Sequence, residues 1–182
     1  MSPVAFTALP ATAQWVAGLV LALQGVFGES HVRVLRFAVR GADTPDWLIQ
    51  HTLEGSRFDL GPLLLSSTFA QAAPQLAADV DPDRMACFEQ LPSFGLDGEL
   101  AGVLAAGGAD IRLRLPARDA HAAASGFVDA LIGARFNEVF VLHTRTAWSR
   151  WFACDVWDRT WVVADAGADQ VWLLCVTDAT GR

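Results

Sequence analysis

The stretch RTAWSRWFACDVWDRTWVVAD, residues 145–165, is apolar on both faces when drawn as β-strands, and this feature constrains the fold most. A hairpin with one face in water alternates apolar and polar residues, because successive side chains point to opposite sides. Here, and in the QVWLLCV run after it, both alternating sets are largely apolar. We therefore expect both faces to be covered, by the chain's own helices, by a protein partner, or by a ligand pocket.

The C-terminal residues are predicted to form a Trp-rich antiparallel meander. A turn in VWDRTW would place Val156 opposite Trp161, and a turn over residues 166–169 would place Asp165 opposite Gln170. The face that carries Trp161 is expected to be the core face. The opposite face is then expected to carry Trp151, Asp155 and Trp157.

The N-terminal half combines helical and strand patterns. A first helix is expected to begin after Thr12 as N-cap and to end at Gly28, where glycine favours a left-handed C-cap. Residues 31–40 and 46–54 are typical of two strands joined as a hairpin by a five-residue loop. Residues 59–108 have a helical pattern that four prolines interrupt, which predicts short helices.

Residues 111–143 are predicted to form a βαβ unit. Apolar and basic residues alternate in IRLRLP, a helical pattern follows over residues 117–132, and NEVFVLHT is typical of a second strand. The whole chain, residues 1–182, is therefore expected to form one α+β domain. Its sheet should be mixed, mostly antiparallel, with about six or seven strands, packed helices, and the helical segment 59–108 inserted between strand regions.

Composition excludes several classes of function. The chain has no lysine and no tyrosine, so all 13 basic residues are arginines, and lysine-dependent nucleotide binding or Schiff-base chemistry is excluded. A net charge of −7 argues against nucleic acid as a partner, because non-specific affinity needs a basic surface. The apolar run 15–27 is too short to span a membrane.

The cysteine count and the residue usage predict a source and a compartment. The three cysteines include no CxxC pair, which favours reduced thiols and a cytoplasmic location. Abundant alanine, arginine and glycine without lysine favour a bacterial source.

Three apparent catalytic or metal-binding patterns have simpler explanations. The aspartates of DVDPD lack the glycine and glutamate of a calcium loop, and Asp81 with Pro82 suits a helix start instead. His121 shares one helical face with a serine and an aspartate, a spacing typical of a solvated face. His143 and Cys154 are expected to lie too far apart for a catalytic pair. No catalytic residue, metal site or cofactor is therefore predicted.

Several arginines lie on or beside predicted strands, where they could line one sheet face and bind an anion, or could be exposed and paired with aspartates. The candidate anion-binding residues are Arg112 and Arg114. The candidate interface or ligand-binding residues are Arg145, Arg150, Trp151, Asp155 and Trp157.

The sequence supports two hypotheses about function. The first is a non-enzymatic domain of the bacterial cytoplasm that acts through protein contacts, as a homodimer or an adaptor, because the apolar content is high and the meander has two apolar faces. The second is a small-molecule binder or enzyme with an Arg/Trp-lined pocket for an anionic or aromatic ligand. Convergence of Arg112, Arg114, Arg145 and Arg150 in a cleft would favour the second hypothesis.

Overall fold

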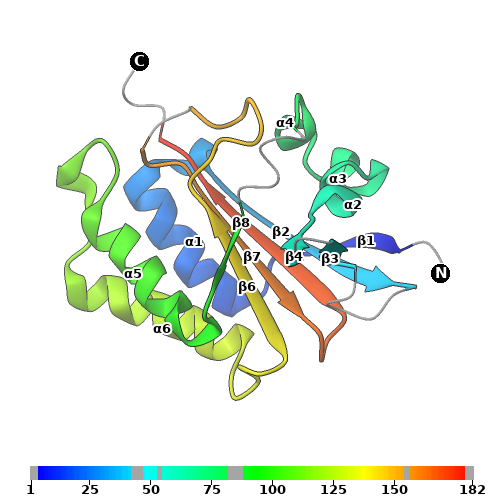
Figure 1. Cartoon of the computed structure of the whole chain (residues 1–182). Coiled ribbons are helices and arrows are strands. Elements are labelled where there is room, and N and C mark those ends of the chain that lie inside the picture. Colours follow the sequence, from blue (N-terminus) through cyan, green and yellow to red (C-terminus); the bar gives the residue numbers. More distant parts are fainter. Residues whose placement is uncertain (1–3, 42–46, 53–54, 82–87, 154–155, 179–182) are drawn as a thin grey trace.

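The structure is a computed structural model and describes residues 4–41, 47–52, 55–81, 88–153 and 156–178. Within these ranges, a six-stranded sheet has the order β1-β2-β8-β7-β6-β5, and every pairing in it is antiparallel (Figure 1). The α+β class is thus confirmed. The strands of this sheet are β1 (Ala5–Leu9), β2 (Val32–Arg40), β5 (Glu89–Leu91), β6 (Val139–Thr144), β7 (Arg159–Asp165) and β8 (Gln170–Val176).

The remaining elements cover the sheet from two sides (Figure 1). One side carries the long helices α1 (Gln14–Phe27), α5 (Leu96–Ala106) and α6 (Ala117–Leu131). The other side carries the short helices α2 (Gly61–Leu64), α3 (Ser67–Ala72) and α4 (Pro74–Ala77). A two-stranded sheet of β3 (Ile49–Thr52) and β4 (Gly55–Phe58) stands apart, and the 3₁₀ turns are η1 (Glu29–His31), η3 (Ser93–Gly95) and η4 (Ile111–Leu113).

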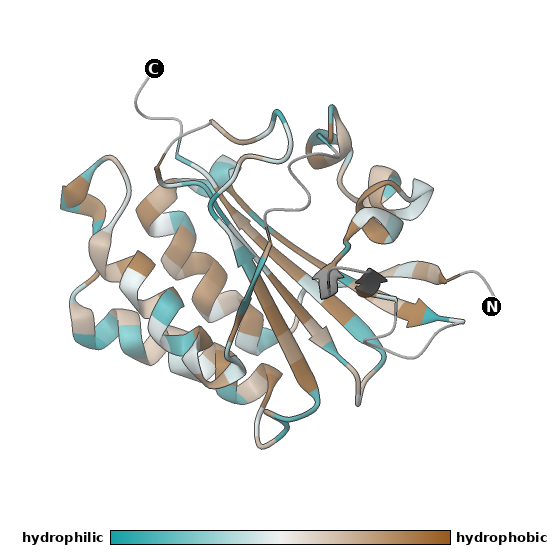
Figure 2. Ribbon diagram, viewed as in Figure 1, coloured by the Kyte–Doolittle hydropathy of each residue, from teal (hydrophilic) through white to brown (hydrophobic). Residues whose placement is uncertain are grey.

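Both faces of the central strands are buried, as their sequence predicts. Trp161 and Trp172 pack with α1, α5 and α6, whereas Val162 and Leu173 pack with α2 to α4. Figure 2 shows hydrophobic residues along the central strands of the sheet. The chain itself therefore covers both faces of β7 and β8, which is the first of the three kinds of cover expected.

The turn between β7 and β8 confirms one predicted register. Asp165 lies opposite Gln170, and residues 166–169 form the turn between them. Asp169 adopts φ 50°, a left-handed conformation that aspartate tolerates better than most residues. Alternating residues of both strands consequently separate onto the faces that the sequence predicts.

Helix α1 ends where predicted but begins one residue later. Ala13, not Thr12, is its N-cap, and no side chain caps it. Gly28 has φ 92° and donates its backbone N–H to the carbonyl of Gln24, which ends the helix. Glycine fits this position because other residues are strained at positive φ.

The predicted βαβ unit over residues 111–143 is wrong. Ile111–Leu113 forms the 3₁₀ turn η4, and Asp110 begins it by accepting the backbone N–H of Arg112. Helix α6 and strand β6 are present as expected, but β6 pairs antiparallel with β5 and β7. Alternation alone does not make a strand, because the backbone also needs a neighbour to pair with.

Two predicted hairpins are also wrong. Strand β2 pairs with β1 and β8, while β3 pairs with β4, so residues 31–40 and 46–54 form no hairpin. Residues 149–153 form turns and bends, and the partner of Trp161 is His143 instead of Val156. The segment 59–108 contains helices α2 to α5 but also strand β5, at the edge of the sheet. A helix beginning at Asp81 would lie outside the described residues.

Candidate functional site

The strongest candidate site lies on the α5 side of strands β6 and β7. His143 is the register partner of Trp161, so both side chains point to the same face of the sheet. Arg159 lies two residues before Trp161 and therefore points to that face as well. With Arg145 and Glu99, these residues form what we call the α5-side cluster: Glu99, His143, Arg145, Arg159 and Trp161.

Helix α5 and strand β5 supply the acidic groups around the cluster. Glu99 Oε1 lies 3.8 Å from Arg145 Nη2, beyond ordinary hydrogen-bond distance. Glu89 Oε2 lies 3.9 Å from His143 Nε2, and the Glu89 side chain is largely exposed. The contacts are loose, so neither carboxylate holds its basic partner firmly.

Three buried nitrogens of the cluster lack a hydrogen-bond partner among the described residues: His143 Nδ1, Arg159 Nε and Trp161 Nε1. We call them the open nitrogens. Trp47 Nε1 is the fourth such atom in the described part of the chain, and it packs on the opposite side of the sheet. A buried donor without an acceptor costs about 1–3 kcal/mol, so three side by side require an explanation, such as a bound water or ion.

The electrostatic environment of Arg159 is unfavourable. Burial lowers the pKa of its guanidinium, and the nearby positive charge of Arg145 lowers it further. Glu99 and Asp158 act in the opposite direction without outweighing these effects. Since arginine stays protonated, this shift means a poorly compensated positive charge. Its Nη1 also donates to the carbonyls of Val156 and Asp158, which fixes the side chain in place.

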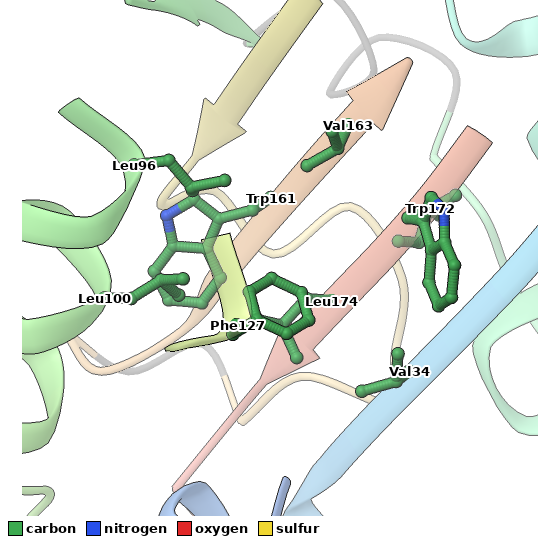
Figure 3. Close-up of a pocket in the computed structure, with 9 residues that line it drawn as sticks. Val34, Leu96, Leu100, Phe127, Trp161, Val163, Trp172 and Leu174 are labelled. Atoms are coloured by element: carbon green, nitrogen blue, oxygen red, sulfur yellow. The ribbon is translucent and has the colours of Figure 1, made fainter. Parts of the chain in front are cut away.

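The cluster runs from the surface into the core. The Arg145 side chain is 65% exposed and the His143 side chain 19%, whereas Trp161 is 1% exposed. Beyond Trp161 lies a narrow apolar cavity of about 10 Å³ between the sheet and the helices. Figure 3 shows Trp161 and Trp172 on opposite sides of this cavity, with Leu100 and Phe127 contributed by the helices.

The predicted basic residues do not converge. Arg112 is 86% exposed and pairs with Asp110 at 2.8 Å, and its hydrogen bonds lower the pKa of that carboxyl to about 2. Arg114 follows η4 and is exposed. Arg150 is 81% exposed and lies 3.2 Å from Asp79. Of the four arginines, Arg145 alone belongs to the α5-side cluster. The expected convergence of all four in one cleft is therefore absent.

The predicted aromatic residues lie on different faces of the sheet. Trp151 packs against the core on the side of α2 to α4, as predicted, and is half-buried. Trp157 packs instead against the core on the α5 side, because residues 149–157 do not continue as a strand. Asp155 lies outside the described residues. No flat exposed tryptophan surface is therefore formed by the described part of this segment.

A second hollow lies between β2 and helices α3 and α4. It has a volume of about 330 Å³, and Arg33, Leu35 and Gln75 are among its lining residues. The Arg33 guanidinium lies 5.7 Å from the centre of the Trp151 ring and donates to Gln75 Oε1 and to the carbonyls of Glu29 and Val32. Because most of its donors are already used, this arginine is less available to a ligand than Arg145 and Arg159.

Sequence reasoning placed Trp161 on the core face but did not identify Glu99, His143 and Arg159 as site residues. The available signal was local: Arg159 and His143 occupy inward positions near the ends of strands whose central residues are apolar. Inward polar residues that lack partners mark candidate sites.

No protein-family model matches the chain, and no curated protein matches its sequence. The class of protein is thus defined by the fold and the site alone: an α+β protein with a polar cluster at the edge of its core. In addition, none of the described helices combines the length and apolarity needed to cross a membrane.

Proposed function

We propose that this protein binds a small ligand at the α5-side cluster. The observation that carries the proposal is the grouping of the three open nitrogens, which have no acceptor among the described residues, beside the exposed guanidinium of Arg145. Small-molecule sites are typically apolar hollows with a few convergent polar groups. The cluster has such groups at its mouth and Trp161, Leu100 and Phe127 behind them. The proposal is for binding and assigns no reaction.

The setting that we propose is the bacterial cytoplasm. Its support is compositional: all basic residues are arginines, and the three cysteines include no CxxC pair. Cys175, the free cysteine in the described part of the chain, is buried.

The proposal is tested by native mass spectrometry of the untagged protein, followed by a thermal-shift screen with small acids and small aromatic compounds. We expect at least one compound to raise the melting temperature of the wild type and to lose most of this effect in Arg145→Gln. Arg150→Gln is the matched control, because it also removes an exposed guanidinium, one that pairs with Asp79 and not with a residue of the cluster. A ligand whose effect is the same in both variants would place the binding site elsewhere and overturn the proposal.

Self-association is a second candidate function, favoured by a separate observation. Leu21 on α1 is 68% exposed, and Ile111 and Leu113 on η4 are 60% and 48% exposed. Helix α1 and η4 contact each other, so two neighbouring elements carry exposed apolar residues. Exposed apolar patches often mark protein contacts. Sedimentation of the wild type and of Leu113→Asp tests this: a dimer that the substitution dissociates supports it, and a monomeric wild type contradicts it.

A further inference from the structure

We propose that the ligand of the α5-side cluster is a small oxyanion, whose oxygens accept hydrogen bonds from Trp161 Nε1 and Arg159 Nε. This inference rests on the proposed function and narrows it, since the sequence leaves an anionic and an aromatic ligand equally open. Arginine and tryptophan side chains can in general bind either kind of ligand. The chemistry and the space at this site distinguish them.

The ligand must present acceptors, because the cluster offers mainly donors. An indole nitrogen and a guanidinium nitrogen can only donate, and His143 Nδ1 can donate in one of its tautomers. The carbonyls of Val156 and Asp158 are already engaged by Arg159 Nη1. A carboxylate or phosphate group supplies several acceptor oxygens within a small volume, which suits neighbouring donors.

The cavity behind Trp161 is too small for an aromatic ring. The cavity behind Trp161 measures about 10 Å³, roughly the space that one water needs. A cavity that binds benzene measures on the order of 150 Å³. Leu96 and Leu100 are fully buried against Trp161, so a ring would have to displace packed side chains. In this proposal the oxyanion binds outside that cavity, between Arg145 and Trp161.

The charge of the site favours an anion over a neutral acceptor. Arg145 and Arg159 lie close enough to repel each other, and burial removes water from Arg159. Glu99 and Asp158 compensate in part, and Glu89 faces His143 from the exposed edge strand. Burial is the largest cause of the lowered pKa of Arg159, and the positive charge of Arg145 adds to it. An oxyanion between the two guanidiniums would pair with both, at the position where Glu99 now makes only a long contact.

The decisive experiment follows the indole N–H resonance of Trp161 by ¹H–¹⁵N NMR in the full-length protein. Trp161→Phe assigns the resonance by its loss. Sodium acetate, sodium phosphate and indole are titrated separately against a chloride background of constant ionic strength. We expect a saturable shift of the Trp161 resonance with acetate, phosphate or both, and no shift of the Trp148 resonance, whose N–H already donates to Thr160. The comparison of acetate with phosphate identifies which oxyanion chemistry the site prefers.

Variants separate a bound anion from a general salt effect. Arg145→Gln should weaken the binding about tenfold, as expected for the loss of one charged hydrogen bond. Arg145 is largely exposed, so this variant should fold even where Arg159→Gln does not. Arg112→Gln is the control and should leave the affinity unchanged, because Arg112 pairs with Asp110 away from the cluster.

The outcomes distinguish this inference from the proposed function. A saturable shift with indole and none with acetate or phosphate would overturn the inference while the proposed binding site stands. A Trp161 resonance that does not respond to any of the three probes would contradict both. Equal weakening by Arg145→Gln and Arg112→Gln would show that salt, and not a site, causes the shift.

Discussion

His143 and Trp161 are direct cross-strand partners on β6 and β7, yet the ring nitrogens that they bury make no hydrogen bond to each other or to any other described residue. Neighbouring polar groups in a packed interior normally satisfy each other or a water. Arg159, two residues along β7, adds a third such nitrogen. An acceptor group bound beside them would satisfy the nitrogens of Trp161 and Arg159, which can only donate.

Trp161→Phe should abolish the stabilisation that an oxyanion gives. At ten times its Kd, a ligand that binds only the folded state stabilises it by about 1.4 kcal/mol. Phenylalanine keeps a ring but has no N–H, so we expect most of this gain to be lost in thermal melts with acetate or phosphate. Trp172→Phe, in the same cavity, is the matched control and should retain the gain. Equal gains in Trp161→Phe and wild type would contradict the assignment.

Glu99→Gln should strengthen oxyanion binding. The carboxylate of Glu99 competes with an anion for Arg145, at 3.8 Å, and the amide keeps its size without its charge. We expect a several-fold lower Kd by NMR titration, because Arg145 then has no competing carboxylate. Glu138→Gln, an exposed position outside the cluster, serves as the control. Weaker binding in Glu99→Gln would mean that Glu99 positions Arg145 for the ligand.

Arg135→Met should destabilise the protein by about 2 kcal/mol. Arg135 Nη1 donates to both oxygens of Asp165, at 2.7 and 2.6 Å, and the Asp165 side chain is only 3% exposed. Removal of the arginine leaves a buried carboxylate whose one remaining hydrogen-bond donor among the described residues is the backbone N–H of Ala168. Urea unfolding measures the loss, and Arg112→Met, whose pair with Asp110 is exposed, should show no measurable change.

Two glycine substitutions should have opposite effects. A Cβ at Gly108 would collide with the Asp178 carboxylate, which is buried and accepts the backbone N–H of Ala109, so Gly108→Ala should lose more than about 1 kcal/mol. Gly102 lies inside α5 with open space around it, so Gly102→Ala should gain about 0.5–1 kcal/mol from the lower entropy of the unfolded chain. Chemical denaturation of both variants tests the pair, and destabilisation by Gly102→Ala would contradict the described environment of α5.

Cys175 should be unreactive in the folded protein. Burial raises the pKa of its thiol to about 12, although the hydroxyl of Thr160 and the charge of Arg33 act in the opposite direction. Iodoacetamide at pH 8 should therefore leave Cys175 unmodified until urea unfolds the chain, as peptide mass spectrometry can show. Rapid modification without urea would show that the β7–β8 region opens readily.

The same thiol predicts how stability depends on pH. In the unfolded chain it ionises near its ordinary pKa of about 9, while in the folded chain it stays protonated up to about 12. The unfolded state therefore binds fewer protons between these values, and the unfolding free energy should fall as the pH rises above 9. Cys175→Ala should show a smaller decrease over this range. Lysine and tyrosine also titrate in this pH range, but the chain contains neither, so they do not obscure the effect of the thiol.

Local patterns predicted the α+β class, helix α6, and the register of β7 and β8. These features depend on residues close together in the sequence: a period of two, a four-residue turn and a helical stripe. The two apolar faces of the C-terminal strands also predicted that the sheet is covered on both sides. In each case the hydrophobic pattern has one favourable arrangement, because a slip by one residue would expose the core.

The wrong predictions concern segments whose hydrophobic pattern is compatible with two different backbone structures. IRLRLP alternates as a strand does, but Asp110 caps a 3₁₀ turn there, and in the described structure no strand pairs with it. The sequence places Val156 opposite Trp161, yet His143 of β6 takes that position. Strand partners distant in sequence are chosen by the packing of the whole core, which no local window contains.

The sequence by itself determined which residues could enter the core and excluded mechanisms that need lysine or tyrosine. Only the tertiary structure decided which polar residues meet. Glu99, His143 and Arg159 lie on three separate elements, α5, β6 and β7, and ordinary sequence spacing gives no hint of their proximity. They meet because β6 pairs with β7 and α5 packs over both, so the α5-side cluster is a product of strand pairing and helix packing rather than of any motif.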